Sequence, residues 1–198
     1  MIFDPSKPPL TDSAGLLKSI PVEAGPEIWK RATRVISSGL CDLQVNGFAG
    51  VDYNDPTLMP EEFEKSLFAM LSTGVTTCLP TVITGSEDWQ IQCFHALEAG
   101  RNASKLAQAM IPGYHLEGPF LNPEEGFCGC HPTKWMRPAT WDHFERLQEA
   151  AGGRITLITV APEIKGVLDL IPKWVEKGIA VAIGHCNPDR DTLLRAAD

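Results

Sequence analysis

Short apolar runs rich in β-branched residues recur along the chain, and turn-forming residues bound each of them. Each run has the length of one strand. The runs are apolar on both alternating faces, which is typical of parallel strands that are covered on both sides. The predicted strands are 40–45, 75–83, 111–118, 155–163 and 179–186.

Amphipathic stretches fill the intervals between these runs. In the first of them, Phe63, Leu67 and Met70 fall on one stripe of a helix that opens with Pro60 and ends at Gly74. The same spacing of apolar residues recurs in two later intervals. The helices predicted in this way are 60–74, 86–100 and 139–153.

Two helix ends carry further signals. Ser86 precedes an acidic first turn and is predicted to cap the helix that follows it. The stretch 170–178 is ambiguous, because Pro172 fits the first turn of a helix but not its interior. Whether a helix fills the interval between the strands at 155–163 and 179–186 therefore stays undecided from the sequence. A last helix begins after residue 187.

The alternation of strands and helices predicts a parallel α/β sheet. Two architectures fit five strands: an open doubly wound sheet, or a partial (β/α)8 TIM-type barrel that comprises the first five strands with their helices. No glycine-rich phosphate-binding fingerprint follows any predicted strand, which weakens the dinucleotide-binding version of the open sheet. Residues 1–37 lack a clear helix or strand pattern and are predicted to be irregular, ahead of a barrel domain at 38–198.

Composition narrows the classes of partner. The 198 residues carry a net charge of −8 and no cluster of Lys and Arg, so we expect no nucleic-acid partner. No apolar run approaches the roughly 18–20 residues of a membrane span, and the N-terminus lacks the pattern of a signal peptide. Six cysteines without an export signal are expected to be free thiols in the cytoplasm.

Polar side chains stand at the carboxyl ends of the predicted strands, where both architectures gather their functional groups. Burial of such a group without a partner costs about 1–3 kcal/mol, so each needs a reason to be there. These residues are Gln44, Asn46, Thr81, Thr84, His115, Glu117, Glu163, His185 and Cys186.

Glu117 and His185 form the sharpest pair among them. They lie two strands apart, where a barrel could direct both at one ion, and carboxylate and imidazole suit Zn²⁺ or another divalent first-row metal. The structural alternative is a glutamate that caps the next loop and a histidine that is hydrogen-bonded in the core. Two ligands alone do not define a metal site.

Two further groups have weaker claims. Gln44 and Asn46 alternate to the same face of a strand, so both amides could hold water or a substrate hydroxyl, although Asn46 before a glycine also suits a turn. Cys128 and Cys130 lack the paired spacing of structural zinc sites. The adjacent His131 could instead donate to a carbonyl or phosphate at the mouth of a barrel.

The sequence resembles the N-acetylglucosamine-6-phosphate deacetylases, a family of the amidohydrolase superfamily. The similarity covers about residues 35–198, and the motifs occur in the order of that family. They are "GLCDLQVNGFAGVDYND", "GVTTCLPTVIT", "GYHLEGPFLNPEEGFCGCHP", "ITLITVAPE" and "GIAVAIGHCNPD".

The resemblance implies a metal-dependent (β/α)8 barrel that hydrolyses N-acetylglucosamine 6-phosphate to glucosamine 6-phosphate and acetate in the cytoplasm. Carried over by position, Glu117 and His185 match metal ligands, and Cys130 and His131 match a loop that contacts the substrate. The implied cofactor is one divalent metal ion, Zn²⁺ or else Fe²⁺, Mn²⁺ or Co²⁺. The implied partner is a small amino-sugar phosphate, and a full-length enzyme is implied to be a homo-oligomer.

Gln44 and Asn46 stand where other amidohydrolases carry His-x-His, which implies that one of two possible metal positions is lost. The family also has a metal-binding histidine on strand six and a catalytic aspartate on strand eight, and this chain ends at Asp198 before both. It includes little of the β-sandwich that accompanies the barrel. We therefore expect the chain to be truncated and to show little activity alone.

Two other functions remain open from the sequence. One is another amidohydrolase, which cleaves a cyclic amide or an N-acyl amino acid. The other is a barrel fragment without catalysis that binds a partner or a sugar.

Overall fold

The computed structural model describes residues 39–198. The prediction of an irregular segment at residues 1–37 lies outside the described residues. Within the part that is described, no helix is both long enough and apolar enough to cross a bilayer.

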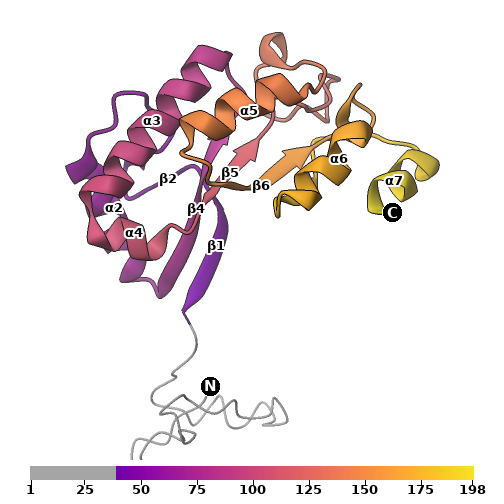
Figure 1. Cartoon of the computed structure of the whole chain (residues 1–198). Coiled ribbons are helices and arrows are strands. Elements are labelled where there is room, and N and C mark those ends of the chain that lie inside the picture. Colours follow the sequence, from indigo (N-terminus) through magenta and orange to yellow (C-terminus); the bar gives the residue numbers. More distant parts are fainter. Residues whose placement is uncertain (1–38) are drawn as a thin grey trace, which may run out of the picture. The chain divides into compact units, whose positions relative to one another are not determined.

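A five-stranded sheet forms the centre of the described part (Figure 1). Its strands follow the order of the sequence, and the three pairings from β4 to β7 are all parallel. A doubly wound sheet would reverse its strand order at a switch point, so this uninterrupted order identifies a partial (β/α)8 barrel, as predicted. The strands are β1 Leu40–Val45, β4 Val75–Ile83, β5 Tyr114–Glu117, β6 Ile155–Val160 and β7 Ala180–Ile183.

The helices connect successive strands and cover the sheet. Helix α3 packs against α2, α4 and α5, and Figure 1 shows α2, α3 and α5 next to one another. The α-helices are α2 Pro60–Leu71, α3 Glu87–Ala103, α4 Lys105–Met110, α5 Trp141–Ala150, α6 Val167–Glu176 and α7 Arg190–Ala197. A short 3₁₀ helix, η1, spans Thr133–Trp135.

Side-chain caps fix where several helices begin. The Ser86 hydroxyl accepts a hydrogen bond from the Trp89 amide at 3.3 Å, which confirms the predicted cap of α3. Ser104 does the same for α4, a helix that the sequence pattern did not predict, by accepting from the Ala107 amide at 3.1 Å. Because Ser104 is extended in backbone conformation, it ends α3 and starts α4 in a single step.

Helix α6 resolves the ambiguity at Pro172. The helix starts at Val167, so Pro172 lies inside it rather than in its first turn. Proline removes one backbone hydrogen bond there. The helix nevertheless forms, because Val167, Leu170 and Trp174 make a buried stripe whose packing outweighs the local preference.

A small hairpin follows β1, which the sequence pattern also did not predict. Its two strands, β2 Gly47–Phe48 and β3 Val51–Asp52, pair antiparallel. A Cβ atom on Gly47 would lie 2.3 Å from the Val51 carbonyl oxygen, so this pairing requires glycine. The hairpin lies directly after the end of β1, beside the polar groups described below.

Burial differs between the middle of the sheet and its borders. Every residue of β5 is buried, and β4 and β6 are mostly buried. On β1 and β7, by contrast, Leu40, Leu43 and Ile183 are 59%, 56% and 38% exposed. Open strands with apolar side chains favour association with other chains.

Candidate metal centre

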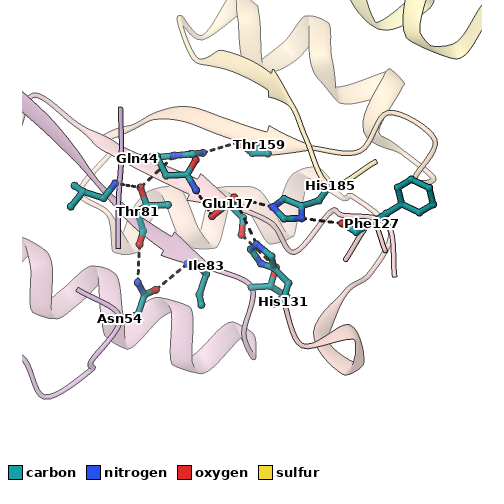
Figure 2. A network of polar contacts seen from close by, with 12 residues as sticks. Gln44, Asn54, Thr81, Ile83, Glu117, Phe127, His131, Thr159 and His185 are labelled. Atoms are coloured by element: carbon teal, nitrogen blue, oxygen red, sulfur yellow. Dashed lines mark hydrogen bonds and ion pairs between the residues drawn. The ribbon is translucent and has the colours of Figure 1, made fainter. Parts of the chain in front are cut away.

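Several polar side chains meet at the carboxyl ends of the strands (Figure 2). Glu117 is the last residue of β5, and Gln44 lies near the end of β1. His131 comes from the loop between β5 and α5, and His185 follows β7. The parallel strand order therefore brings residues that are far apart in sequence to one edge of the sheet.

The Glu117 carboxylate is the centre of this cluster. Its Oε1 atom lies 3.2 Å from Nε2 of His185 and 3.7 Å from Nε2 of His131. Its Oε2 atom accepts a hydrogen bond from the Gln44 side-chain amide at 2.9 Å. One ligand atom from each of Glu117, His131 and His185 lies within 4.8 Å of the others, so a single ion could contact all three.

The ring orientation of His185 is set by its other nitrogen. Nδ1 lies 3.0 Å from the carbonyl oxygen of Phe127, which can only accept a hydrogen bond, so Nδ1 carries the proton. In the neutral ring, Nε2 then presents a bare lone pair to Glu117. Two acceptors that face each other at 3.2 Å require a cation or a proton between them.

His131 is held in a similar way by Thr84. Nδ1 of His131 lies 3.0 Å from the Thr84 hydroxyl, and that hydroxyl has a longer contact of 3.4 Å to the Glu117 backbone carbonyl. If the hydroxyl donates to the carbonyl, it accepts from a protonated Nδ1, and in the neutral ring Nε2 of His131 then presents a lone pair to Glu117. If the hydroxyl donates to Nδ1 instead, Nε2 carries a proton and becomes a donor.

This donor set fits a divalent metal ion. It offers one carboxylate oxygen and up to two imidazole nitrogens, the ligands that Zn²⁺ and other first-row divalent metals accept. Phe127, Thr84 and Gln44 orient the ligands from behind, as outer partners do in metal sites. The arrangement does not require the cysteines.

The charge of Glu117 is preserved despite its burial. Burial alone would raise the pKa of this carboxyl group, but the His131 imidazole and the Gln44 amide outweigh burial and hold the pKa below its usual range. The carboxylate is therefore charged at neutral pH and its side chain is only 7% exposed. A buried negative charge that has no Lys or Arg partner among the described residues attracts a cation.

His185 has an unusual backbone. Its φ angle is 50°, in the left-handed region that disfavours residues with a Cβ atom. A conformation of this kind costs on the order of 1–3 kcal/mol and is found most often at functional sites. The turn directs the imidazole back toward Glu117 immediately after β7 has ended.

His115 lies beneath the cluster and is fully engaged. Its ring nitrogens contact the hydroxyls of Thr81 at 3.4 Å and Thr159 at 2.7 Å. Burial lowers the pKa of His115, although Glu117 acts in the opposite direction. This histidine therefore links β4 and β6 through two hydroxyls and is buried rather than an exposed reactive group.

Asn54 holds the backbone at the end of β4 and makes a longer contact of 3.5 Å from its amide nitrogen to the Asn46 carbonyl after β1. No sequence pattern indicated this role. The Asn54 side-chain amide donates to the Thr81 carbonyl at 2.9 Å and accepts from the Ile83 amide at 3.0 Å (Figure 2). Asn54 follows the hairpin described above, and its position depends on that hairpin. A motif search could find it only by knowing that a second strand lies beside it.

The other predicted residues lie away from the carboxylate. Asn46 is exposed, and it contributes through its backbone: its carbonyl oxygen accepts a hydrogen bond from the Tyr53 amide at 2.9 Å. Cys130 is exposed, and its side chain forms no hydrogen bond within residues 39–198. The six cysteines are all free, and Cys128 and Cys130 do not join the metal-ligand cluster among the described residues.

An apolar pocket adjoins the cluster on the His131 side. Its volume is about 350 Å³, and its walls include Trp89 and Trp135. Thr84, which contacts His131, and Pro132, which follows it in the chain, also line the pocket. A molecule bound there would contact Thr84 and Pro132, the two neighbours of His131.

The fold and the cluster define the class of the protein: a partial (β/α)8 barrel with a carboxylate and histidines at the carboxyl ends of its strands. Within this class, known homologues and structural neighbours are N-acetylglucosamine-6-phosphate deacetylases, as the motifs predicted. No protein-family model matches the chain.

Three relatives illustrate the similarity. The chain is 29% identical over 180 residues to the N-acetylglucosamine-6-phosphate deacetylase of Bacillus subtilis, which covers 86% of this chain. It is 33% identical over 190 residues to an N-acetylgalactosamine-6-phosphate deacetylase of Shewanella, which covers 93%. A solved structure of the Mycobacterium smegmatis N-acetyl-D-glucosamine-6-phosphate deacetylase in complex with N-acetyl-D-glucosamine-6-phosphate superposes with a TM-score of 0.72, at 27% identity over 81% of this chain.

The shared part is less than half of each relative. The chain spans 43% and 45% of the two curated relatives and 40% of the solved structure. The fold and the similarity to these relatives are therefore established for this part alone, and the activity of the whole enzyme is a proposal.

Proposed function

We propose that this chain carries the metal-binding part and a substrate-binding part of an amidohydrolase that deacetylates N-acetylglucosamine 6-phosphate. The observation that carries the proposal is the position of His185, whose Nδ1 donates to Phe127 and whose Nε2 faces the charged Glu117 carboxylate at 3.2 Å. The names of the relatives support the choice of an acetylated amino-sugar phosphate as substrate. An enzyme for a cyclic amide or an N-acyl amino acid has no comparable support.

The proposed cofactor is one divalent metal ion held by Glu117 and His185. Zn²⁺ is the proposed ion, and Fe²⁺, Mn²⁺ and Co²⁺ are accepted by the same oxygen and nitrogen donors. Such an ion, when bound, polarises a carbonyl group and lowers the pKa of water. Gln44 donates a hydrogen bond to Glu117 and adds no charge of its own, which supports a single metal position.

His131 is proposed to face the substrate. It lies farther from Glu117 than His185 does, and it borders the pocket through Thr84 and Pro132. With a proton on Nε2 it would donate to the acetyl carbonyl as negative charge develops there, a role worth roughly 10²–10³ in rate when such a donor is removed elsewhere. Cys130 would contribute its backbone to the same loop.

The reaction breaks the acetamide C–N bond. Water adds to the acetyl carbon, acetate leaves, and the amine nitrogen takes up a proton. The general base stays unassigned, because none of the described groups that pair with Glu117 is a second carboxylate. The aspartate implied by the family resemblance would take this role.

The apolar pocket offers a place for the sugar. Trp89 and Trp135 present apolar ring surface, which packs well against the C–H face of a pyranose. The pocket does not by itself distinguish glucose from galactose configuration, and relatives of both kinds match the chain. We propose N-acetylglucosamine 6-phosphate as the main ligand and its galactose epimer as the comparison ligand.

The remaining proposals concern the setting of the protein. Residues 38–198 are proposed as the barrel domain, with residues 1–37 on the side of the β-sandwich. Six free thiols support a cytoplasmic location. A homo-oligomer is proposed for the full-length enzyme from the family resemblance. The exposed Leu40, Leu43 and Ile183 lie on border strands that the remaining strands of a complete barrel would pair with.

Calorimetry with and without metal tests the proposal. We expect N-acetylglucosamine 6-phosphate to bind the Zn²⁺-loaded chain and to lose this binding in Glu117→Gln. Acetate is measured in parallel, and a sample of the sugar phosphate without protein gives the background. Acetate release above this background would show catalysis. A Glu117→Gln variant that keeps full metal occupancy and normal ligand binding would end the assignment.

A His131→Ala variant separates the two possible roles of that histidine. As a substrate contact, it should weaken sugar-phosphate binding while Zn²⁺ affinity changes by less than about threefold, because Glu117 and His185 are untouched. A loss of Zn²⁺ affinity as large as that of Glu117→Gln would instead make His131 a metal ligand.

A further inference from the structure

Glu163 is a polar residue of the carboxyl edge that the proposed function does not use. It follows β6, and its Oε1 atom accepts two hydrogen bonds. One comes from the Asn122 side-chain amide at 2.8 Å, and the other from the Asn187 backbone amide at 2.6 Å. Asn122 follows β5 and Asn187 follows β7, so one carboxylate oxygen joins the loops after three consecutive strands.

These loops enclose the turn that carries His185. The Asn122 backbone amide donates to the His185 carbonyl at 2.9 Å. On the side that precedes the turn, the Gly184 amide donates to the Val160 carbonyl at 3.1 Å. Asn187, two residues after His185, is held by Glu163. The left-handed conformation of His185 is thus fixed by hydrogen bonds before, at and after it.

The orientation of Asn122 is itself fixed. Its side-chain oxygen accepts from the Glu124 amide at 2.8 Å, so its NH₂ group must face Glu163. Both donors on Oε1 of Glu163 are therefore assigned. The Oε2 atom is buried and has no hydrogen-bond partner among residues 39–198.

We propose that Glu163 is a positioning residue for His185: through Asn122 and Asn187 it holds the strained turn that directs the imidazole at Glu117. The inference rests on the proposed metal site and deepens it. Among the described residues, Glu163 forms no hydrogen bond with Glu117 or with the His185 imidazole. Its effect is on the geometry of a ligand, as for outer partners of other metal sites.

Metal titration of three variants tests this role. We expect Glu163→Ala to weaken Zn²⁺ and Co²⁺ binding to the full chain by about 10-fold to 100-fold, the range typical for loss of an outer partner. Glu163→Gln should stay within about threefold of the original affinity, because its oxygen can replace Oε1 and its amide takes the place of the unpartnered Oε2.

Glu98→Ala is the matched control. Glu98 of α3 also accepts hydrogen bonds from two partners, Tyr114 and Arg154. These partners lie at the start of β5 and just before β6, away from the carboxyl ends of the strands. Loss of Glu98 should lower stability and leave metal affinity unchanged. Equal loss of affinity in Glu98→Ala and Glu163→Ala would attribute the effect to general destabilisation and overturn the proposal.

A metal-free measurement makes the test independent of the proposed function. Long-range ¹H–¹⁵N spectra of the histidine rings should show a shifted His185 ring in Glu163→Ala, because the hydrogen bond to Phe127 is lost, while His143 in α5 stays unchanged. Unchanged His185 signals would overturn the proposal. If the original chain bound neither Zn²⁺ nor Co²⁺, the proposed function would fail, and the His185 spectrum would still decide the role of Glu163.

Discussion

Two mostly buried carboxylates lie near opposite ends of β5 and have different surroundings: Glu98 of α3 contacts the first residue of this strand, and Glu117 is its last residue. Glu98 accepts from Nη1 of Arg154 at 2.7 Å and from the Tyr114 hydroxyl at 2.7 Å. Arginine is charged at every physiological pH, so this negative charge is balanced by a permanent cation. The Glu98 cluster is complete as a structural ion pair.

Glu117 has no such cation among the described residues. Its partners are an amide and two histidines, neither of which carries a permanent charge. Burial of an unbalanced charge is unfavourable, and proteins retain such groups where they bind ions or react. Burial and the number of hydrogen bonds therefore do not distinguish a structural from a functional carboxylate. The presence of a permanent opposing charge does distinguish them.

Removal of each carboxylate charge gives the largest expected difference. Glu117→Gln should lower Zn²⁺ affinity by more than the roughly 100-fold that loss of an outer partner costs, because a direct ligand and the only charge of the site are removed. Glu98→Gln should leave affinity unchanged. Calorimetric titration of both variants measures this, and a similar change in the two would erase the distinction between the clusters.

Stability should show the reverse order. Glu98→Ala leaves Arg154 and the buried Tyr114 hydroxyl without their partner, and we expect a loss of about 2 kcal/mol in the free energy of unfolding, since Arg154 is partly exposed. In the absence of metal, Glu117→Gln should lose less than about 1 kcal/mol, because the removed charge had no permanent cation. Urea unfolding of the two metal-free variants tests this, and a larger loss in Glu117→Gln would contradict it.

The part of this contrast that concerns Glu117 and His185 followed from the sequence, for a physical reason. Parallel strands end at one edge of a sheet, so strand prediction alone brings the ends at Glu117 and His185 together. The pattern could not show that Gln44 donates to Glu117 or that Phe127 orients His185, because these bonds join residues 73 and 58 positions apart. They depend on loop geometry, which local propensity does not encode.

Sequence patterns missed some elements because these elements are too short for a periodic signal, and misplaced one helix start because tertiary packing outweighed a local preference. Helix α4 is 6 residues long, too short for a periodic signal, and its cap at Ser104 is a single residue. Pro172 favoured a helix start, yet α6 begins earlier because its buried stripe includes Val167. Asn54 acquires its role from the adjacent hairpin, whose strands have 2 residues each.

A third carboxylate, Glu87, has one permanently charged partner and one partner that titrates, so we expect the stability of its cluster to depend on pH. It pairs with Arg146 and also lies 3.0 Å from Nδ1 of His143. Burial lowers the pKa of His143 to about 4; Glu87 opposes this, and Arg137 and Arg146 add to it. The usual pKa of histidine in an unfolded chain is about 6.5.

The sign of the effect follows from these values. Below about pH 6.5 the unfolded chain binds a proton that folded His143 does not, so stability is complete above that pH and falls as the pH drops toward 4. Between pH 7 and 5.5 we expect His143 to contribute a loss of about 1 kcal/mol. Urea unfolding at each pH measures it, and His143→Gln should flatten the profile, whereas a change at the exposed His95 to Gln should not. An unchanged slope in His143→Gln would refute this.

The smallest expected effect concerns the cysteines beside the cluster. Cys128 and Cys130 lie in the same loop as His131, and a thiolate site would bind Zn²⁺ through them. The structure groups carboxylate and imidazole atoms without either thiol, and Cys130 is exposed. A double Cys128→Ser and Cys130→Ser variant should therefore keep Zn²⁺ affinity within about twofold, because no ligand and no outer partner is removed. The Co²⁺-loaded form should correspondingly lack the near-ultraviolet charge-transfer band of a thiolate ligand. A tenfold loss of affinity, or such a band that disappears in the double variant, would move the metal from Glu117 to the cysteine loop and would make Glu117 a buried charge without a function.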